Sequence, residues 1–173
     1  GIPVYYTIVK GAGIDDIISD NSGQTNWTKK DHVHNLVVSG NKNYVILENF
    51  MNKYPMFNIT EHLMFLSNSF TSVDKDDFIE GKFKAGDIDK AEEWVTDLLS
   101  LKPYFEKYYN RSIFVRAMIK IMSRKPEFSF KEFLRKVQLR PGSIYPCGSV
   151  ELYIVMIEDI YNYKRKDKLN LRF

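Results

Sequence analysis

The chain has 173 residues, 44% of them hydrophobic and 14% aromatic, so it has enough apolar side chains to bury a substantial core. No apolar run approaches the roughly 20 residues of a membrane span, and the sequence shows no basic-then-apolar leader. The single cysteine, Cys147, excludes an internal disulfide. We therefore expect a folded cytoplasmic protein that does not enter a membrane.

The formal net charge of +3 hides an uneven distribution. Residues 1–100 contain 9 Lys and Arg against 15 Asp and Glu, a balance of −6, whereas residues 101–173 contain 16 against 7, a balance of +9. A basic surface attracts nucleic acid because each neutralised phosphate releases condensed counterions. The same surplus is also typical of a solvated basic face that balances an acidic one. Nucleic acid is therefore a candidate partner, not a required one.

The chain opens with a predicted strand followed by a short helix. Residues 2–11, "IPVYYTIVKG", are rich in β-branched and aromatic types and end at a glycine, which is typical of a strand. They are apolar at nearly every position, which predicts burial on both faces. No second convincing strand occurs before position 76, so we expect the sheet partners upstream of Gly1 or in another copy of the chain. Residues 13–21 then place three isoleucines on one side of a helix.

Three helices joined by short turns follow, as in a compact bundle. The first covers residues 28–39, with Thr28 and Asp31 as an approximate capping box and Gly40 after its last residue. The second covers residues 41–54 and is closed by a proline. The third begins at Asn58, which stands in capping-box spacing with a glutamate three residues later.

Beyond Phe70 the helical pattern loosens and then resumes. Residues 77–85 alternate apolar and charged side chains around Gly81, which predicts a short hairpin or an exposed loop and a seam between subdomains near 70–86. Asp87 then caps a strongly periodic helix that Pro103 ends or interrupts. Three more helices are expected over residues 111–122, 129–137 and 149–163. The predicted fold class is mainly α: a bundle of about six to seven helices with one N-terminal strand.

Two groups of basic residues are the candidate functional residues. Arg116, Lys120 and Arg124 recur at steps of four, which places them on one face of a helix. Near the C-terminus, "YNYKRKDKLNLRF" interleaves tyrosines with Lys164, Arg165 and Lys166. Cations bind phosphates, and aromatic rings beside them stack on bases. The alternative for the second group is an ordinary basic helix end, which the helix dipole favours.

The sequence gives little support to catalysis or to a metal site. His32 and His34 are two residues apart on a helix, so their side chains diverge by about 200° and do not chelate one metal. Cys147 precedes a helix whose N-terminus would lower a thiol pKa, but no base accompanies it, so we expect a structural role. We therefore expect no metal, no cofactor and no enzymatic activity of this chain alone.

The order of strand, short acidic helix, polar loop and capped helix resembles the later part of the ParB-like domain, the superfamily of partition proteins and sulfiredoxin, and most of all its phage and mobile-element relatives. In that family an upstream motif of the DGQHR type precedes the strand, and a loop resembling "ENxxR" contacts nucleotide phosphates. The matching loop here is residues 20–24, with Asn21, Ser22 and Gln24 in the phosphate-facing positions. The family arginine is replaced by Gln24, which lacks its charge and its bidentate geometry.

The resemblance implies that residues 1–40 are the C-terminal remnant of a ParB-like domain and that residues 41–173 form a helical domain. It implies a non-catalytic, DNA-associated domain of a phage or mobile-element protein that binds nucleic acid through its basic half. Two alternatives remain open. One is a module for protein interaction or self-association; the other is part of a nucleotide-dependent or nuclease-like enzyme completed by an upstream segment.

Overall fold

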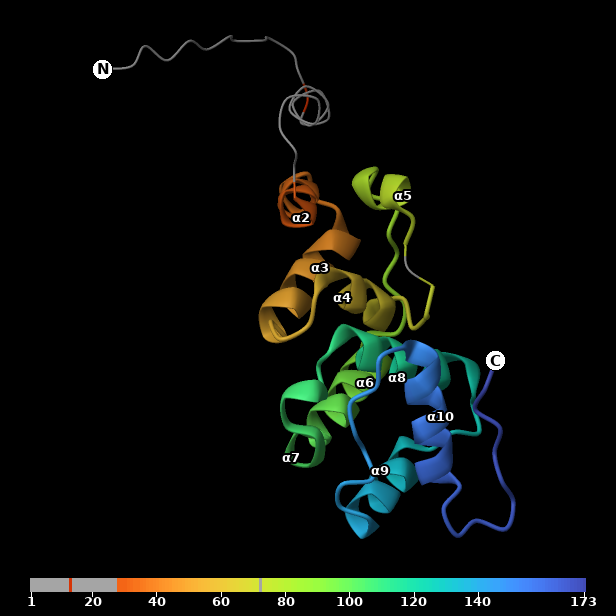
Figure 1. The fold of residues 1–173 in the computed structure, drawn as a ribbon. Coiled ribbons are helices and arrows are strands. Elements are labelled where there is room, and N and C mark those ends of the chain that lie inside the picture. The colour runs from red at the N-terminus through yellow and green to blue at the C-terminus, as the bar shows by residue number, and fades with distance from the viewer. Residues whose placement is uncertain (1–12, 14–27, 72) are drawn as a thin grey trace.

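Nine α-helices and one 3₁₀ helix form the secondary structure of the computed structural model, which describes residues 13, 28–71 and 73–173 (Figure 1). The mainly helical fold class is confirmed. The strand predicted over residues 2–11 and, apart from Gly13, the short helix over 13–21 lie outside the described residues. The elements are α2 (Lys29–Val38), α3 (Lys42–Lys53), α4 (Ile59–Leu66), α5 (Lys75–Ile79), α6 (Ile88–Ser100), α7 (Lys102–Phe105), η1 (Glu106–Tyr108), α8 (Ser112–Arg124), α9 (Phe130–Leu139) and α10 (Val150–Tyr161).

Side-chain caps fix where the helices begin. The capping boxes predicted at Thr28 and Asn58 are both complete, with reciprocal hydrogen bonds to the third residue of α2 and α4. At Ser129, the N-cap of α9, only half of such a box is formed. The Ser129 hydroxyl accepts from the Glu132 N–H at 3.3 Å, but the Glu132 carboxylate turns to Arg135 instead of returning to the cap.

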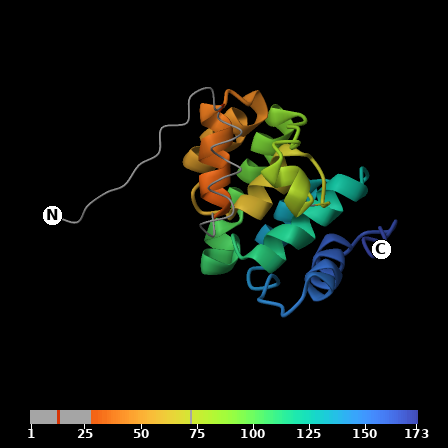
Figure 2. The same ribbon diagram turned by 90° about the horizontal axis from the view of Figure 1, so that it is seen from above.

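The helices pack in a continuous series, which Figures 1 and 2 show from two sides. Helix α2 packs on α3, α3 on α4, α4 on α6 and α8, α8 on α10, and α10 on α9. Helix α4 is the centre of this series, and its residues 61–66 are all buried. The buried apolar side chains of the described residues form one cluster from Val33 to Leu171, so both sides of the predicted seam at 70–86 share one core. The domain boundary at residue 40 stays a prediction.

The hairpin predicted near 77–85 is wrong, because residues 75–79 form α5 and no strand is assigned between 73 and 87. The apolar alternation there reflects two aromatic anchors. Phe78 and Phe83 are both buried, and their ring centroids lie 5.6 and 5.9 Å from that of Tyr44 on α3. The Tyr44 hydroxyl also donates a hydrogen bond to the Phe78 carbonyl. The segment therefore lies along α3 as a short helix and a loop.

The last predicted helix ends at Tyr161 and not at Tyr163, and residues 162–173 fold back along α10 as a C-terminal tail. Glu158 of α10 holds this tail: its carboxylate accepts from the Leu171 N–H at 2.7 Å and pairs with Arg172 at 3.0 Å. Leu171 is fully buried. The tail therefore brings its last residue, Phe173, toward α8 (Figure 1).

Candidate nucleic-acid interface

Helix α8 presents a row of cations on the side that faces away from the core. Its inward face buries Phe114, Met118 and Ile121, as its apolar periodicity predicts. Arg116, Lys120 and Arg124 lie on the other side, because four-residue steps return to nearly the same face of a helix. Lys125, the residue that ends α8, extends the row. We call these four residues, Arg116, Lys120, Arg124 and Lys125, the α8 cation row.

Two aromatic rings lie within the α8 cation row. The Phe70 ring, from the loop after α4, has Arg116, Lys120 and Arg124 at 5.7, 5.4 and 5.5 Å from its centroid. The Phe173 ring, from the C-terminal tail, has Lys120 and Lys125 each at 4.9 Å and Arg124 at 5.8 Å. Cations at such distances from a ring gain roughly 0.5–1 kcal/mol at exposed sites. The rings therefore help to hold like charges close together.

The α8 cation row forms no ion pair among the residues that the structure describes, although the charge of Arg116 acts on the buried carboxylate of Glu61 on α4. The Lys125 ammonium instead donates to the Asn170 carbonyl of the tail at 2.8 Å. An approaching phosphate thus meets cations that are not already neutralised, and Phe173, whose side chain is 54% exposed, offers an apolar surface beside them.

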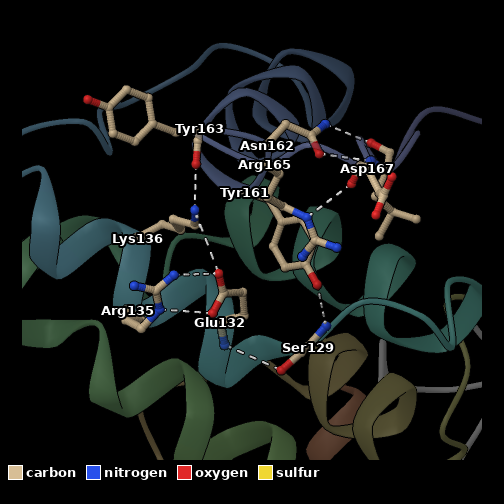
Figure 3. A network of polar contacts seen from close by, with 10 residues as sticks. Ser129, Glu132, Arg135, Lys136, Tyr161, Asn162, Tyr163, Arg165 and Asp167 are labelled. Carbon is tan, nitrogen blue, oxygen red and sulfur yellow. Dashed lines mark hydrogen bonds and ion pairs between the residues drawn. The ribbon is translucent and has the colours of Figure 1, made fainter.

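The second predicted group, Lys164, Arg165 and Lys166, lies in the turn after α10 and not in a helix. We call it the α10 turn group. The Arg165 guanidinium lies 4.7 Å from the Tyr161 ring centroid, and its Nε donates to the Asp167 carbonyl at 3.2 Å (Figure 3). Lys164 lies 5.3 Å from the Tyr163 ring. Lys164 and Lys166 are exposed, whereas Arg165 is half-buried, so the three are not equally available to a ligand.

The α10 turn group rests on a polar network from α9, drawn in Figure 3. Lys136 is 4% exposed, donates to the Tyr163 carbonyl and lies 3.7 Å from Glu132. Arg135 donates two hydrogen bonds to the Glu132 carboxylate, at 2.9 and 2.8 Å. Hydrogen bonds from Arg135, with the nearby charges of Lys136 and Arg165, hold the pKa of Glu132 below its usual value. Part of the predicted second group therefore stabilises the fold.

The cations were predicted from the sequence, but the residues that surround them were not. Phe70 is remote from the α8 cation row in the sequence, and no spacing connects the two. Arg140, whose guanidinium lies 4.3 Å from the Tyr163 ring, was also missed. Lys125 was identifiable in principle, since it directly follows Arg124.

The other candidate residues give no alternative site. Asn21, Ser22 and Gln24 lie outside the described residues. His32 is 8% exposed and His34 is exposed, so their side chains diverge as predicted. No three metal-binding side chains gather within the described part of the chain. Burial raises the pKa of the Cys147 thiol, which is the opposite of nucleophile activation.

No protein-family model matches the chain, and neither a curated protein nor a solved structure matches it. Within residues 28–71 and 73–173, every helix is too short or too polar to cross a bilayer.

Proposed function

We propose that the chain is a non-catalytic nucleic-acid-binding domain whose contact surface is the α8 cation row together with the exposed lysines of the α10 turn group. The observation that carries the proposal is that no member of the α8 cation row forms an ion pair within the described structure. Four adjacent cations that are not paired in this way keep a positive potential, which binding to phosphates relieves.

The chemistry of this surface supports sequence-independent binding. Lysine and arginine contacts with phosphates position a nucleic acid without reading its bases. Phe173 adds an exposed ring of the kind on which bases stack, and stacking tolerates every base. The α8 cation row and Phe173 therefore provide both kinds of contact, with phosphates and with bases, that non-specific binders of single strands combine.

The relationship to ParB-like proteins of phages and mobile elements is part of the same proposal. It is supported by the order of elements predicted from the sequence between positions 1 and 40 and by the sequence of residues 20–24. A DNA-associated role is consistent with the basic surface, but the two arguments are independent, because the surface lies entirely in residues 70–173.

Fluorescence anisotropy with labelled single-stranded and duplex DNA, titrated over a range of salt concentrations, tests the binding. The logarithm of the affinity should fall linearly with the logarithm of salt, by about 0.7 per neutralised phosphate for a single strand and about 0.9 for a duplex. Replacing Arg116, Lys120 and Arg124 together by alanine should lower that slope by about two to three.

A charge-matched control separates this surface from net charge. Lys29, Lys42 and Lys102 are exposed and lie on α2, α3 and α7, away from the α8 cation row. Their triple alanine variant removes the same charge and should keep the wild-type slope. Absence of binding by the wild type at low salt, or equal losses in the two triple variants, would refute the proposal.

A further inference from the structure

A cleft of about 530 Å³ separates α6 from the turn that joins α8 to α9. One wall is a single face of α6, with Lys90, Glu93, Trp94 and Asp97 at helical spacing. The opposite wall includes Lys125, and the volume falls within the range of small-molecule sites. Apart from Lys125, no residue that lines this cleft belongs to the contact surface proposed above.

The cleft opens between the two basic groups. Lys125 belongs to the α8 cation row and also lines the cleft. Ser129, another lining residue, donates its N–H to the Tyr161 hydroxyl at 3.2 Å, and Arg165 of the α10 turn group covers the Tyr161 ring. A strand that contacts both groups therefore passes the mouth of the cleft.

The charged side chains of the cleft do not neutralise one another. Lys90, Lys125 and Lys131 line it together with Glu93 and Asp97, yet no ion pair joins these five residues in the part of the chain that the structure describes. Burial raises the pKa of Asp97 to about 6, and the charge of Glu93 adds to that rise. A carboxylate in its ionised form accepts hydrogen bonds and donates none.

We propose that this cleft receives an unpaired guanine of a single strand, whose imino and amino N–H groups donate to Asp97 and Glu93 while the lysines hold the flanking phosphates. The inference rests on the proposed nucleic-acid binding and assigns it a preferred substrate. Guanine presents two adjacent N–H donors on its Watson–Crick edge, one for each of the two carboxylates that line the cleft. In a duplex that edge is already paired, so the cleft selects single strands.

A divalent cation fits the cleft less well than a base. Hard cations take about six or more oxygen ligands, whereas this cleft offers two carboxylates and three ammonium groups that repel a cation. A free phosphate meets the opposite difficulty, because both carboxylates face it. An occupant that carries N–H donors at one end and phosphates at the other satisfies both sets of charges.

Binding of thymidine strands that differ at one central position tests the proposal. The strands carry deoxyguanosine, deoxyinosine or deoxythymidine there, and deoxyinosine keeps the imino group of guanine but lacks its amino group. The wild-type chain should bind the deoxyguanosine strand about tenfold more tightly than the all-thymidine strand, since a pair of well-formed hydrogen bonds to one base edge discriminates by that order. The strand with deoxyinosine should lack most of this tenfold gain in affinity.

Variants then assign the preference to the cleft. Asp97→Asn and Glu93→Gln should remove the preference for deoxyguanosine and leave the salt slope unchanged. Asp89→Asn, an exposed acid in the first turn of the same helix, is the matched control and should keep the preference. If Asp97→Asn instead increases the affinity for all three strands by the same factor, Asp97 only repels phosphate and the proposal is wrong.

The two proposals fail in different ways. Equal affinity of the wild type for all three strands refutes the guanine cleft and leaves nucleic-acid binding in place. Absence of binding to every strand at low salt refutes both.

Discussion

Protonation of His62 should make the protein markedly less stable in acid. His62 lies on α4 and is 1% exposed, with the ring of Phe50 at 5.6 Å and that of Phe57 at 6.3 Å. Its Nδ1 is buried and has no hydrogen-bond partner among the described residues. Burial lowers the pKa of the imidazole from 6.5 to about 4, and the Phe57 backbone offsets this only in part.

The sign and size of the effect follow from this shift. Because the pKa in the folded state is lower than in the unfolded state, the unfolded chain binds the proton first as the pH falls. The stability that depends on a neutral His62 is fully present above pH 6.5 and is lost as the pH falls toward 4. The shift corresponds to about 3 kcal/mol, of which about 2.5 kcal/mol is lost by pH 4.5. That is a large part of a typical total stability of roughly 5–15 kcal/mol.

Urea unfolding at pH 7 and pH 4.5, followed by circular dichroism, measures this loss. The comparison is made between the wild type, His62→Leu and His34→Leu, because the exposed His34 is a matched control on the neighbouring α2. Burial raises the pKa of Asp97 and of Glu61, so the protonation of both groups favours the folded state as the pH falls. This contribution is the same in all three proteins and cancels in the comparison. Replacing His62 should remove about 2.5 kcal/mol of the pH dependence. A His62→Leu protein with the wild-type pH dependence would refute the reasoning.

Three further substitutions test the local structure by thermal unfolding. Asn58→Ala removes the side-chain acceptor that caps α4 and should lower the stability by about 1 kcal/mol; an unchanged melting temperature would contradict the role of the cap. Gly81→Ala and Gly142→Ala both place a side chain at positive φ, which destabilises by about 1–2 kcal/mol. Gly81→Ala should be the more harmful, because its Cβ would lie 3.0 Å from Leu36 whereas nothing lies within 4 Å at Gly142; equal effects would exclude steric crowding at Gly81.

Local signals explain why the helices were predictable. The caps at Thr28 and Asn58 and the apolar face of α8 act within one or two helical turns, so a reader of the sequence has all the interacting residues in view. The hairpin prediction for residues 77–85 was wrong for the opposite reason. Phe78 and Phe83 stand among charged residues in a pattern that resembles a hairpin, but their partner, Tyr44, is distant in the sequence. Burial against Tyr44 overrides the local pattern.

The candidate site shows the same limit. Helical spacing was sufficient to place Arg116, Lys120 and Arg124 on one face, because all three belong to one helix. The aromatic rings among them come from a loop and from the C-terminal tail, and only the tertiary fold brings these to α8. The last helix was predicted to end at Tyr163, and nothing in the sequence indicated that the tail folds back, where the Leu171 N–H donates to Glu158.

The arrangement of the α8 cation row is itself an argument for an anionic partner. Like charges four residues apart destabilise a helix by roughly 0.2–0.5 kcal/mol per pair, and α8 contains two such pairs, Arg116 with Lys120 and Lys120 with Arg124. Ion pairs with acidic residues would relieve that repulsion, yet Glu158 pairs with Arg172 and Glu132 pairs with Arg135, so neither pairs with the row. Phe70 and Phe173 offset part of the repulsion without neutralising any charge. The fold therefore holds the cations together and leaves their charge for a ligand to balance.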